Sequence, residues 1–281
     1  MTGAASTKPS ATRSPWRFFA LVFALAIPFW VLGFVFDQGL LGGLGISLPV
    51  SALAFVCPAI AAMILVYREE QFGGVARLLR RVFDGGRVRP RVWYAPALLL
   101  LPALYLLSYV VMRLLGVPIP DLHISPLTIL FLFALFFITG ACEEVGWTGY
   151  ALDPLQQRRT ALAAALILGI VWSGIHVIPD MQGGQTLGWI AGQRLFTIAL
   201  RVLMVWLYNN AGGSLFAVIL VHAMDNVSVF AIFPNNGGSH YIPAITAALT
   251  ILAALIVTYL WGAKTLARFR FASYNTRPPH K

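Results

Sequence analysis

The chain has 281 residues, of which 59% are hydrophobic and only 11% charged, and its formal net charge is +10. Soluble domains carry roughly 25% charged residues, so this composition excludes a soluble core protein and predicts a membrane protein. The positive charge does not indicate a nucleic-acid partner, because most Lys and Arg residues fall in short gaps between apolar segments, as the positive-inside rule describes. Membrane lipids are the expected surroundings.

The N-terminal segment, residues 1–16, is polar and contains Ser, Thr and Pro, which predicts a disordered cytoplasmic tail. The apolar run that follows, from Phe18 to Phe36, is longer than the 7–15 residues of a cleaved signal peptide. We therefore expect a retained first helix. The two cysteines, Cys57 and Cys142, both lie in apolar runs. They predict small buried residues rather than a disulfide or a metal–thiolate site.

Eight segments are long enough to cross a bilayer, which needs roughly 20 apolar residues. Spans are predicted at 17–36, 48–67, 92–115, 126–149, 161–178, 187–208, 212–233 and 241–262. Because a lipid-exposed span must satisfy its own backbone hydrogen bonds, helices are favoured. The sequence therefore predicts an all-α, polytopic integral membrane protein. It forms a single transmembrane domain over 17–262, followed by a basic cytoplasmic tail at 263–281.

The distribution of basic residues between the loops predicts the orientation. Seven arginines lie between the second and third spans: Arg68, Arg77, Arg80, Arg81, Arg87, Arg89 and Arg91. The alternate loops near 37–47, 118–125, 179–186 and 234–240 contain no Lys or Arg. Both termini are therefore predicted to be cytoplasmic, with the protein in the plasma membrane. A short amphipathic helix around Val75–Val82 is expected at the interface, with its arginines setting topology and contacting lipid headgroups.

A few ionisable side chains lie inside the predicted spans, where a charge costs several kcal/mol and usually has a function. They are Glu143, Glu144, His176, Arg194, Arg201, His222 and Asp225. His222 and Asn226 are separated by one helical turn and share a face, which Asp225 nearly shares. Trp172 and His176 have the same spacing, so Trp172 could line a cavity beside the imidazole or simply pack in the core.

The turn near Arg158–Thr160 suggests which of these residues lie at the same depth. If the helices before and after it pack antiparallel, Glu143 faces His176, roughly 24 Å along the helix axis from the turn. His222 and Asn226 lie at comparable depth in the seventh span. We therefore expect one glutamate, two histidines and one asparagine to converge inside the membrane.

This set of side chains suits the activation of water for amide hydrolysis. A buried carboxylate can act as a general base near neutral pH. A neutral histidine can ligate a metal or hold a water molecule, and a His/Asn pair can donate to an oxyanion. The alternative for any single histidine is a hydrogen bond between helices. Four such residues at compatible depth weaken that alternative.

Three short motifs in these spans resemble those of a known family, the CAAX prenyl endopeptidase and bacteriocin-processing (CPBP) intramembrane proteases. Glu143–Gly149 is similar to the family's Glu-Glu-x-x-x-Arg-Gly, with Thr148 in place of the arginine. Trp172–His176 resembles Phe-x-x-x-His with Trp for Phe, and His222–Asn226 matches His-x-x-x-Asn/Asp. The resemblance covers about 126–230 and implies a catalytic core of four to five helices. Each motif alone is weak, but the three in order on successive spans are specific.

The resemblance implies an endopeptidase that cuts a membrane-associated peptide or protein, either of the prenylated CAAX type or bearing a leader. It assigns Glu143 as the general base beside His176, with His222 and Asn226 on the far side of the water or at the oxyanion. Glu144 would support the site. Family members are described both as metalloproteases and as glutamate-dependent enzymes. A divalent metal, with zinc the expected ion, would be held by Glu143, His176 and His222; the sequence leaves both mechanisms open.

The replacement of the motif arginine by Thr148 leaves Glu144 without its expected cation. Either Glu144 is protonated, or another helix supplies a cation. Arg201 on the sixth span is our candidate partner, with Arg194 second, because each is an intramembrane cation that needs an anion. Two other functions remain open. The chain could be a catalytically inactive relative that acts as a membrane binding or immunity protein, or a proton-coupled transporter. Oligomeric state and the membrane face of the cavity are left open.

Overall fold

The computed structural model describes residues 13–35, 50–122, 125–233 and 241–267. Within these ranges every regular element is helical, and eight helices are long and apolar enough to cross a membrane. The prediction of an all-α, polytopic membrane protein is confirmed. The predictions for residues 1–12, for the loops at 37–47 and 234–240, and for 268–281 lie outside the described residues.

The spans follow the predicted order. The first span is α1 (Pro15–Val35). The second contains η2 (Val50–Val56), α2 (Cys57–Arg80) and η3 (Arg81–Phe83). After η4 (Gly85–Arg87), the third contains η5 (Arg91–Trp93) and α3 (Tyr94–Leu114). The next two contain α4 (Pro126–Gly146), η6 (Trp147–Leu152) and α5 (Asp153–Gln156), then α6 (Ala161–Ile175) and α7 (Val177–Gln182). The last three are α8 (Leu187–Asn210), α9 (Leu215–Ile232) and α10 (Pro243–Trp261).

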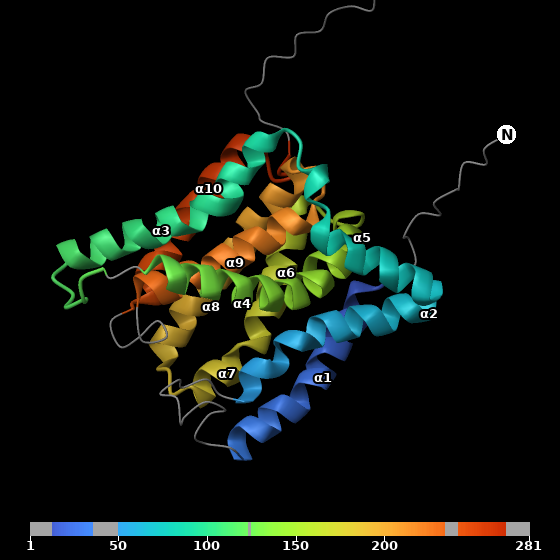
Figure 1. The fold of residues 1–281 in the computed structure, drawn as a ribbon, viewed down its shortest axis with the longest axis horizontal. Helices are drawn as coiled ribbons and strands as arrows, with labels where there is room; N and C mark the ends of the chain where they lie inside the picture. Colours follow the sequence, from blue (N-terminus) through green and yellow to red (C-terminus); the bar gives the residue numbers. More distant parts are fainter. Residues whose placement is uncertain (1–12, 36–49, 123–124, 234–240, 268–281) are drawn as a thin grey trace, which may run out of the picture.

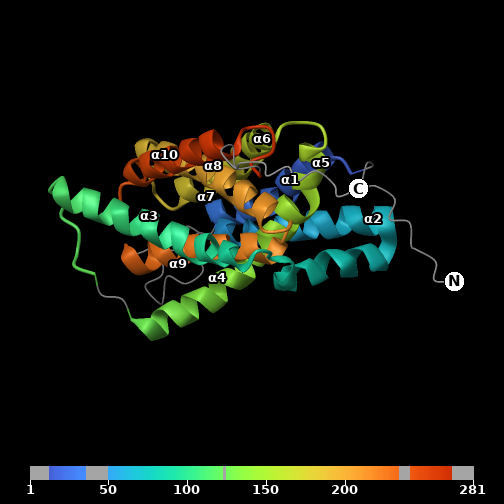
Figure 2. The ribbon, with the colours of Figure 1, turned by 90° about the horizontal axis from the view of Figure 1, so that it is seen from above.

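The helices that carry the three motifs form the middle of the molecule. In Figure 1, α4, α6, α8 and α9 lie between the α1–α2 pair on one side and the α3–α10 pair on the other. The helix α8 is the most buried of the eight spans, and α4 is the least buried. Figure 2 shows the first half of α4 projecting away from the bundle, with its C-terminal end inside it. The end of α4 is where the two glutamates lie.

Two spans extend well beyond their predicted ends. The helix α2 does not end near 67 but continues to Arg80 across a break at Gln71, whose φ is 57°. The expected interfacial helix at Val75–Val82 is therefore mostly the last part of α2. After α4 the chain continues through η6, a single π-helical turn. Such turns occur often at functional sites because they re-aim side chains.

The N-terminal tail, predicted at residues 1–16, overlaps the first helix by two residues. The helix α1 already begins at Pro15. Arg13 is also held, because its guanidinium lies 2.6 Å from a carboxylate oxygen of Glu70 on α2. At the other end, the backbone carbonyls of Ala263 and Lys264 accept hydrogen bonds from the first residues of α6. The described parts of both tails are thus attached to the bundle.

Local sequence determines where the four central helices begin and how closely they pack. Each begins at a Ser or Thr whose hydroxyl accepts a hydrogen bond from a backbone amide in the first turn; these are Ser125, Thr160, Thr186 and Ser214. Gly140 on α4 lies against His222, which a Cβ would approach to 3.3 Å. A Cβ at Gly169 on α6 would lie 3.0 Å from the backbone of α8. Small residues at these crossings let the polar side chains of neighbouring helices meet.

Arg81 differs from the prediction that the loop arginines contact lipid headgroups. It is only 22% exposed, and its guanidinium donates to the carbonyl of Gly149 in η6 at 3.2 Å. It also donates to the hydroxyl of Tyr208 on α8 at 2.8 Å, and that hydroxyl donates to the Asp153 carboxylate at 3.1 Å. Arg81 therefore connects three segments that support the end of α4. This prediction is wrong for Arg81 because its side chain turns into the bundle.

We expect Arg81→Ala to lower the free energy of unfolding by about 1–3 kcal/mol, because it leaves buried partners without a donor. The measurement is thermal or denaturant unfolding of the purified protein in detergent. The matched control is Arg80→Ala, since Arg80 is the neighbouring arginine and is exposed. Equal stability of the two variants would show that the Arg81 contacts do not stabilise the fold.

Candidate active site

Glu143 lies at the centre of a buried cluster in which α4, α6 and α9 meet. Its side chain is 8% exposed, and Oε2 accepts a hydrogen bond from Nε1 of Trp172 at 2.7 Å. Nε2 of His176 lies 4.0 Å from Oε2, and Nε2 of His222 lies 3.7 Å from Oε1. The structure therefore brings together three of the four residues that the sequence placed in one layer. The predicted opposition of Glu143 and His176 is confirmed.

The hydrogen bonds of both imidazoles define which ring nitrogen carries the proton. Nδ1 of His176 lies 2.9 Å from the carbonyl of Trp172, which can only accept. Nδ1 of His222 lies 3.0 Å from Oε1 of Glu144, a carboxylate already paired with a guanidinium. Nδ1 is therefore the donor in both rings. When these rings are neutral, each Nε2 keeps a free lone pair on the side of Glu143.

Glu144 is held by a buried cation from another helix. Arg201 on α8 lies with Nη1 2.8 Å from Oε2 and Nη2 3.0 Å from Oε1, which is a two-pronged pairing. The side chains of both partners are essentially inaccessible. Thr148 also donates its hydroxyl to Oε2. The predicted partner of Glu144 is confirmed; the second candidate, Arg194, pairs instead with Asp180 at 2.9 Å.

The two glutamates contact the same imidazole from opposite sides. This was not expected, because neighbouring residues point about 100° apart around the helix axis. His222 reaches Glu144 through Nδ1 and Glu143 through Nε2. Glu144 therefore holds the ring of His222 in place, while Glu143 faces the free Nε2 of that ring. Carboxylates commonly orient functional histidines in this way.

Trp172 contacts Glu143, Arg201 and both histidines of the cluster. The guanidinium of Arg201 lies over its ring at 4.1 Å from the centroid, and the imidazoles of His176 and His222 lie beside it at 5.9 and 5.4 Å. Its Nε1–H donates to Glu143. The sequence left open whether Trp172 lines a cavity or packs in the core, and the structure shows a different role. Trp172 is a buried hydrogen-bond donor that connects Glu143 with Arg201, the partner of Glu144.

We expect Trp172→Phe to lower kcat by about 10–100-fold, because a hydrogen bond to a charged group contributes about 1.5–3 kcal/mol. The phenyl ring keeps the stacking on Arg201 but cannot donate to Glu143. The measurement is kcat and KM on one peptide substrate. Thermal unfolding of the same preparations is the control. An unchanged kcat would show that this hydrogen bond does not orient the carboxylate.

The two remaining candidates on α9 lie outside this set of contacts. Asp225 accepts a hydrogen bond from the hydroxyl of Tyr105 on α3 at 2.9 Å; among the described residues it forms no ion pair with either histidine. Asn226 is half-buried and has no hydrogen-bond partner within the described part of the chain, so its amide is free to bind a ligand. Sequence reasoning missed Tyr105, because a tyrosine in an apolar span gives no signal of its partner.

The atoms around Glu143, two imidazole nitrogens and a carboxylate, are of the types that zinc binds in proteins. Both Nε2 atoms have free lone pairs, and both Nδ1 atoms donate to oxygens, the usual arrangement around metal-binding histidines. Ligand atoms of a tetrahedral zinc site lie about 3.4 Å apart, slightly less than the two separations to Glu143. Within the described residues, however, no group of three or more His, Cys, Asp or Glu side chains is arranged so that it could hold a metal ion. The same nitrogens and carboxylate oxygens can accept hydrogen bonds from a water molecule.

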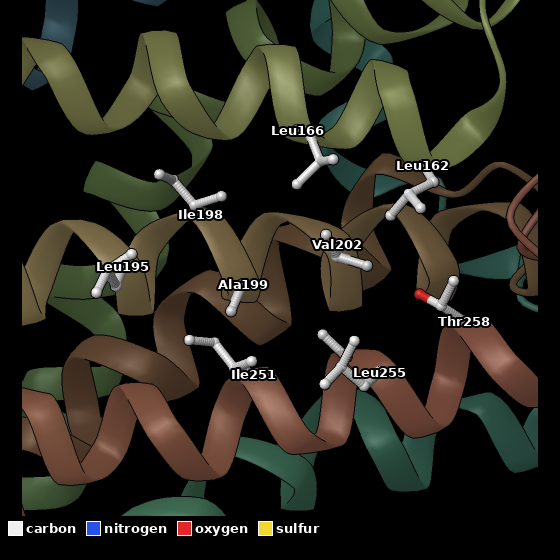
Figure 3. A pocket seen from close by; sticks show the side chains of 10 residues that line it. Leu162, Leu166, Leu195, Ile198, Ala199, Val202, Ile251, Leu255 and Thr258 are labelled. Carbon is white, nitrogen blue, oxygen red and sulfur yellow. The ribbon is translucent and has the colours of Figure 1, made fainter.

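An apolar cavity lies elsewhere. It has a volume of about 260 Å³ and lies between α6, α8 and α10, as Figure 3 shows. Its lining consists of Leu162, Leu166, Leu195, Ile198, Ala199, Val202, Ile251, Ala254, Leu255 and Thr258. No ionisable group lines it, so it offers no chemistry. In the polar cluster the most accessible group is His176, whose side chain is 35% exposed, so a substrate would reach Glu143 from that side.

Comparison with known proteins agrees with the motifs. Residues 125–228 match the protein family described as Type II CAAX prenyl endopeptidase Rce1-like. Over 202 residues the chain is 26% identical to CAAX prenyl protease 2 of Methanococcus maripaludis, which covers 66% of this chain and 72% of that relative. The matched family segment contains every residue of the Glu143 and Glu144 clusters. The resemblance inferred from the three motifs is confirmed.

Proposed function

We propose, from its similarity to the Rce1-like CAAX prenyl endopeptidases and from the cluster around Glu143, that this chain is an intramembrane endopeptidase. The observation that carries the proposal is a buried carboxylate facing the free nitrogens of two imidazoles whose other nitrogens are held by oxygens. This geometry supports general-base activation of one water molecule. The plasma membrane, with both termini cytoplasmic, remains our proposed location.

In the proposed reaction Glu143 takes a proton from the water as its oxygen attacks the carbonyl carbon of the scissile peptide bond. Nε2 of His222 or of His176 accepts a hydrogen bond from the other proton of the water and holds the molecule in place. The free amide of Asn226 donates to the oxyanion that forms. Glu143 then gives its proton to the leaving nitrogen, so the amide is cleaved to a carboxylate and an amine with no covalent enzyme intermediate.

A bound divalent metal, with zinc as the expected ion, would be held by Glu143, His176 and His222 and would lower the pKa of the water. The roles of the surrounding residues are the same with or without it. Glu144 fixes the tautomer of His222 through Nδ1, and Arg201 keeps that carboxylate charged inside the membrane. Trp172 orients Glu143.

The structure also bears on the two alternatives. An inactive relative was considered mainly because Thr148 replaces the motif arginine. Arg201 supplies the missing cation in the required position, which favours an active enzyme. A proton-coupled transporter would use the same acids and histidines as relays. Loss of proteolysis in Glu143 variants, with no proton-dependent uptake by the wild type, distinguishes the enzyme from the transporter.

The proposed substrate is a membrane-associated peptide with a prenylated cysteine near its C-terminus, since the relative is named a CAAX prenyl protease. We expect a farnesylated CAAX peptide to be cut after the cysteine at least about tenfold faster than the same peptide without farnesyl. Each buried CH₂ contributes about 0.8 kcal/mol to membrane partitioning, which concentrates the prenylated form at the enzyme. Mass spectrometry of the released tripeptide measures this. Cleavage of a leader-bearing peptide alone would contradict the substrate and leave the peptidase intact.

A further inference from the structure

A polar pocket lies in the segment between α2 and α3, in the part of the chain before the matched family segment. It has a volume of about 220 Å³ and is lined by Gly85, Gly86, Val88, Arg89, Arg91 and Tyr94. Figure 1 shows the start of α3 near the end of α10, at one end of the bundle. The hydroxyl of Tyr94 donates to the carbonyl of Gly85 at 2.9 Å and holds this wall of the pocket in place.

Two cations face this pocket without a protein counter-ion. Arg89 and Arg91 are exposed, and neither has a hydrogen-bond or ion-pair partner among the described residues. The nearby carboxylates are engaged elsewhere. Asp84 accepts hydrogen bonds at the start of α9, and Asp153 accepts one from Tyr208. Two neighbouring guanidinium groups on one pocket wall repel each other unless an anion lies between them, and their planar donors match phosphate oxygens.

The surroundings of the pocket indicate the level of lipid headgroups. Trp93, next to the pocket, packs with Trp206 and Trp261, with centroid separations of 5.2 and 6.5 Å. Tryptophans concentrate at the boundary between hydrocarbon and headgroups. Phe83 and Val92 flank the pocket in sequence and are 76% and 65% exposed. A ligand that fits this combination has an anionic group for the arginines and hydrocarbon chains for the exposed apolar side chains.

We propose that this pocket binds the phosphate of an anionic phospholipid, with Arg89 and Arg91 donating to its oxygens. The site differs from a diffuse basic surface because two specific side chains line one defined pocket. It is separate from the Glu143 cluster and does not rest on the proposed function.

The test uses the full chain purified in detergent, titrated with phosphatidylglycerol and followed by native mass spectrometry. We expect Arg89→Gln/Arg91→Gln to weaken phosphatidylglycerol binding by at least about tenfold, since two charge-assisted hydrogen bonds are lost. The matched control is Arg158→Gln/Arg159→Gln, which removes two exposed arginines from another loop and should leave binding unchanged. Phosphatidylcholine should bind at least about tenfold more weakly than phosphatidylglycerol.

Several results would overturn the proposal. Equal losses in both double variants would show only a general charge effect, and no loss in the Arg89/Arg91 variant would show that the pocket is not the site. Displacement of phosphatidylglycerol by an equal concentration of inorganic phosphate would show a simple anion site. Because both arginines are exposed, the variants should fold; a single Arg91→Gln variant, expected to lose part of the affinity, repeats the test with a smaller change.

Discussion

Replacing Arg201 with methionine should destabilise the protein by about 3–5 kcal/mol, the usual cost of removing one partner of a buried ion pair. Glu144 has no access to solvent, so without the guanidinium its charge is uncompensated inside the membrane. The same change removes the guanidinium that positions Glu144, the carboxylate that holds the ring of His222 through Nδ1. Loss of such an orienting contact lowers activity by about 10–100-fold. Unfolding in detergent and kcat on one peptide substrate measure the two effects.

A second variant tests whether the position or only the charge of Arg201 matters. Thr148→Arg in the Arg201→Met background restores the arginine of the family motif, one turn beyond Glu144 and in the favourable order on the helix. We expect it to recover most of the lost stability and part of the activity. If Arg201→Met alone has wild-type stability, or if the double variant is worse than the single one, the ion pair is not what holds Glu144.

Changing Glu143 to glutamine should reduce kcat by about 10²–10⁴-fold, the usual contribution of general-base catalysis. The amide keeps the size of the side chain and can still accept from Trp172, but it cannot take a proton from water. We expect the variant to fold, because Glu143 has no cation comparable to Arg201 among its contacts. Thermal unfolding and peptide cleavage of the same preparation separate the two effects.

The matched control for this change is Glu144→Gln, its neighbour in sequence. That variant should mainly lose stability, because it leaves Arg201 buried without a counter-ion, and it keeps an acceptor for His222. A Glu143→Gln enzyme with wild-type kcat would show that the cluster does not act as the base. A greater loss of kcat in Glu144→Gln than in Glu143→Gln would exchange the two assigned roles.

Helical spacing and the cost of intramembrane charge together predicted the main features of the site. The turn near Arg158–Thr160, with antiparallel helices on either side of it, placed Glu143 opposite the imidazole of His176. The pairing of Glu144 with Arg201 followed because each charge needs a partner inside a membrane. Eight spans followed from hydropathy. These inferences depend on periodicity and charge, which a sequence displays directly.

Other features depend on side-chain direction, which the sequence does not display. Of the seven arginines between the second and third spans, only the structure shows that Arg81 turns inward to reach Gly149. The polar segment after Tyr67 suggested the end of a span, but the backbone continues as helix beyond Gln71. The link between Tyr105 and Asp225 joins residues 120 positions apart. Each is a long-range contact with no local pattern to announce it.

The central claim, that Glu143 activates a water molecule for direct attack on the peptide bond, is tested by a single turnover in ¹⁸O-labelled water. The purified wild-type enzyme, in excess over a farnesylated CAAX peptide, should place one ¹⁸O atom in the new carboxylate at the cleavage site, and Glu143→Gln should release no labelled product. First-turnover product without ¹⁸O, or label found on the Glu143 side chain, would show that the carboxylate attacks the substrate itself and would contradict the mechanism.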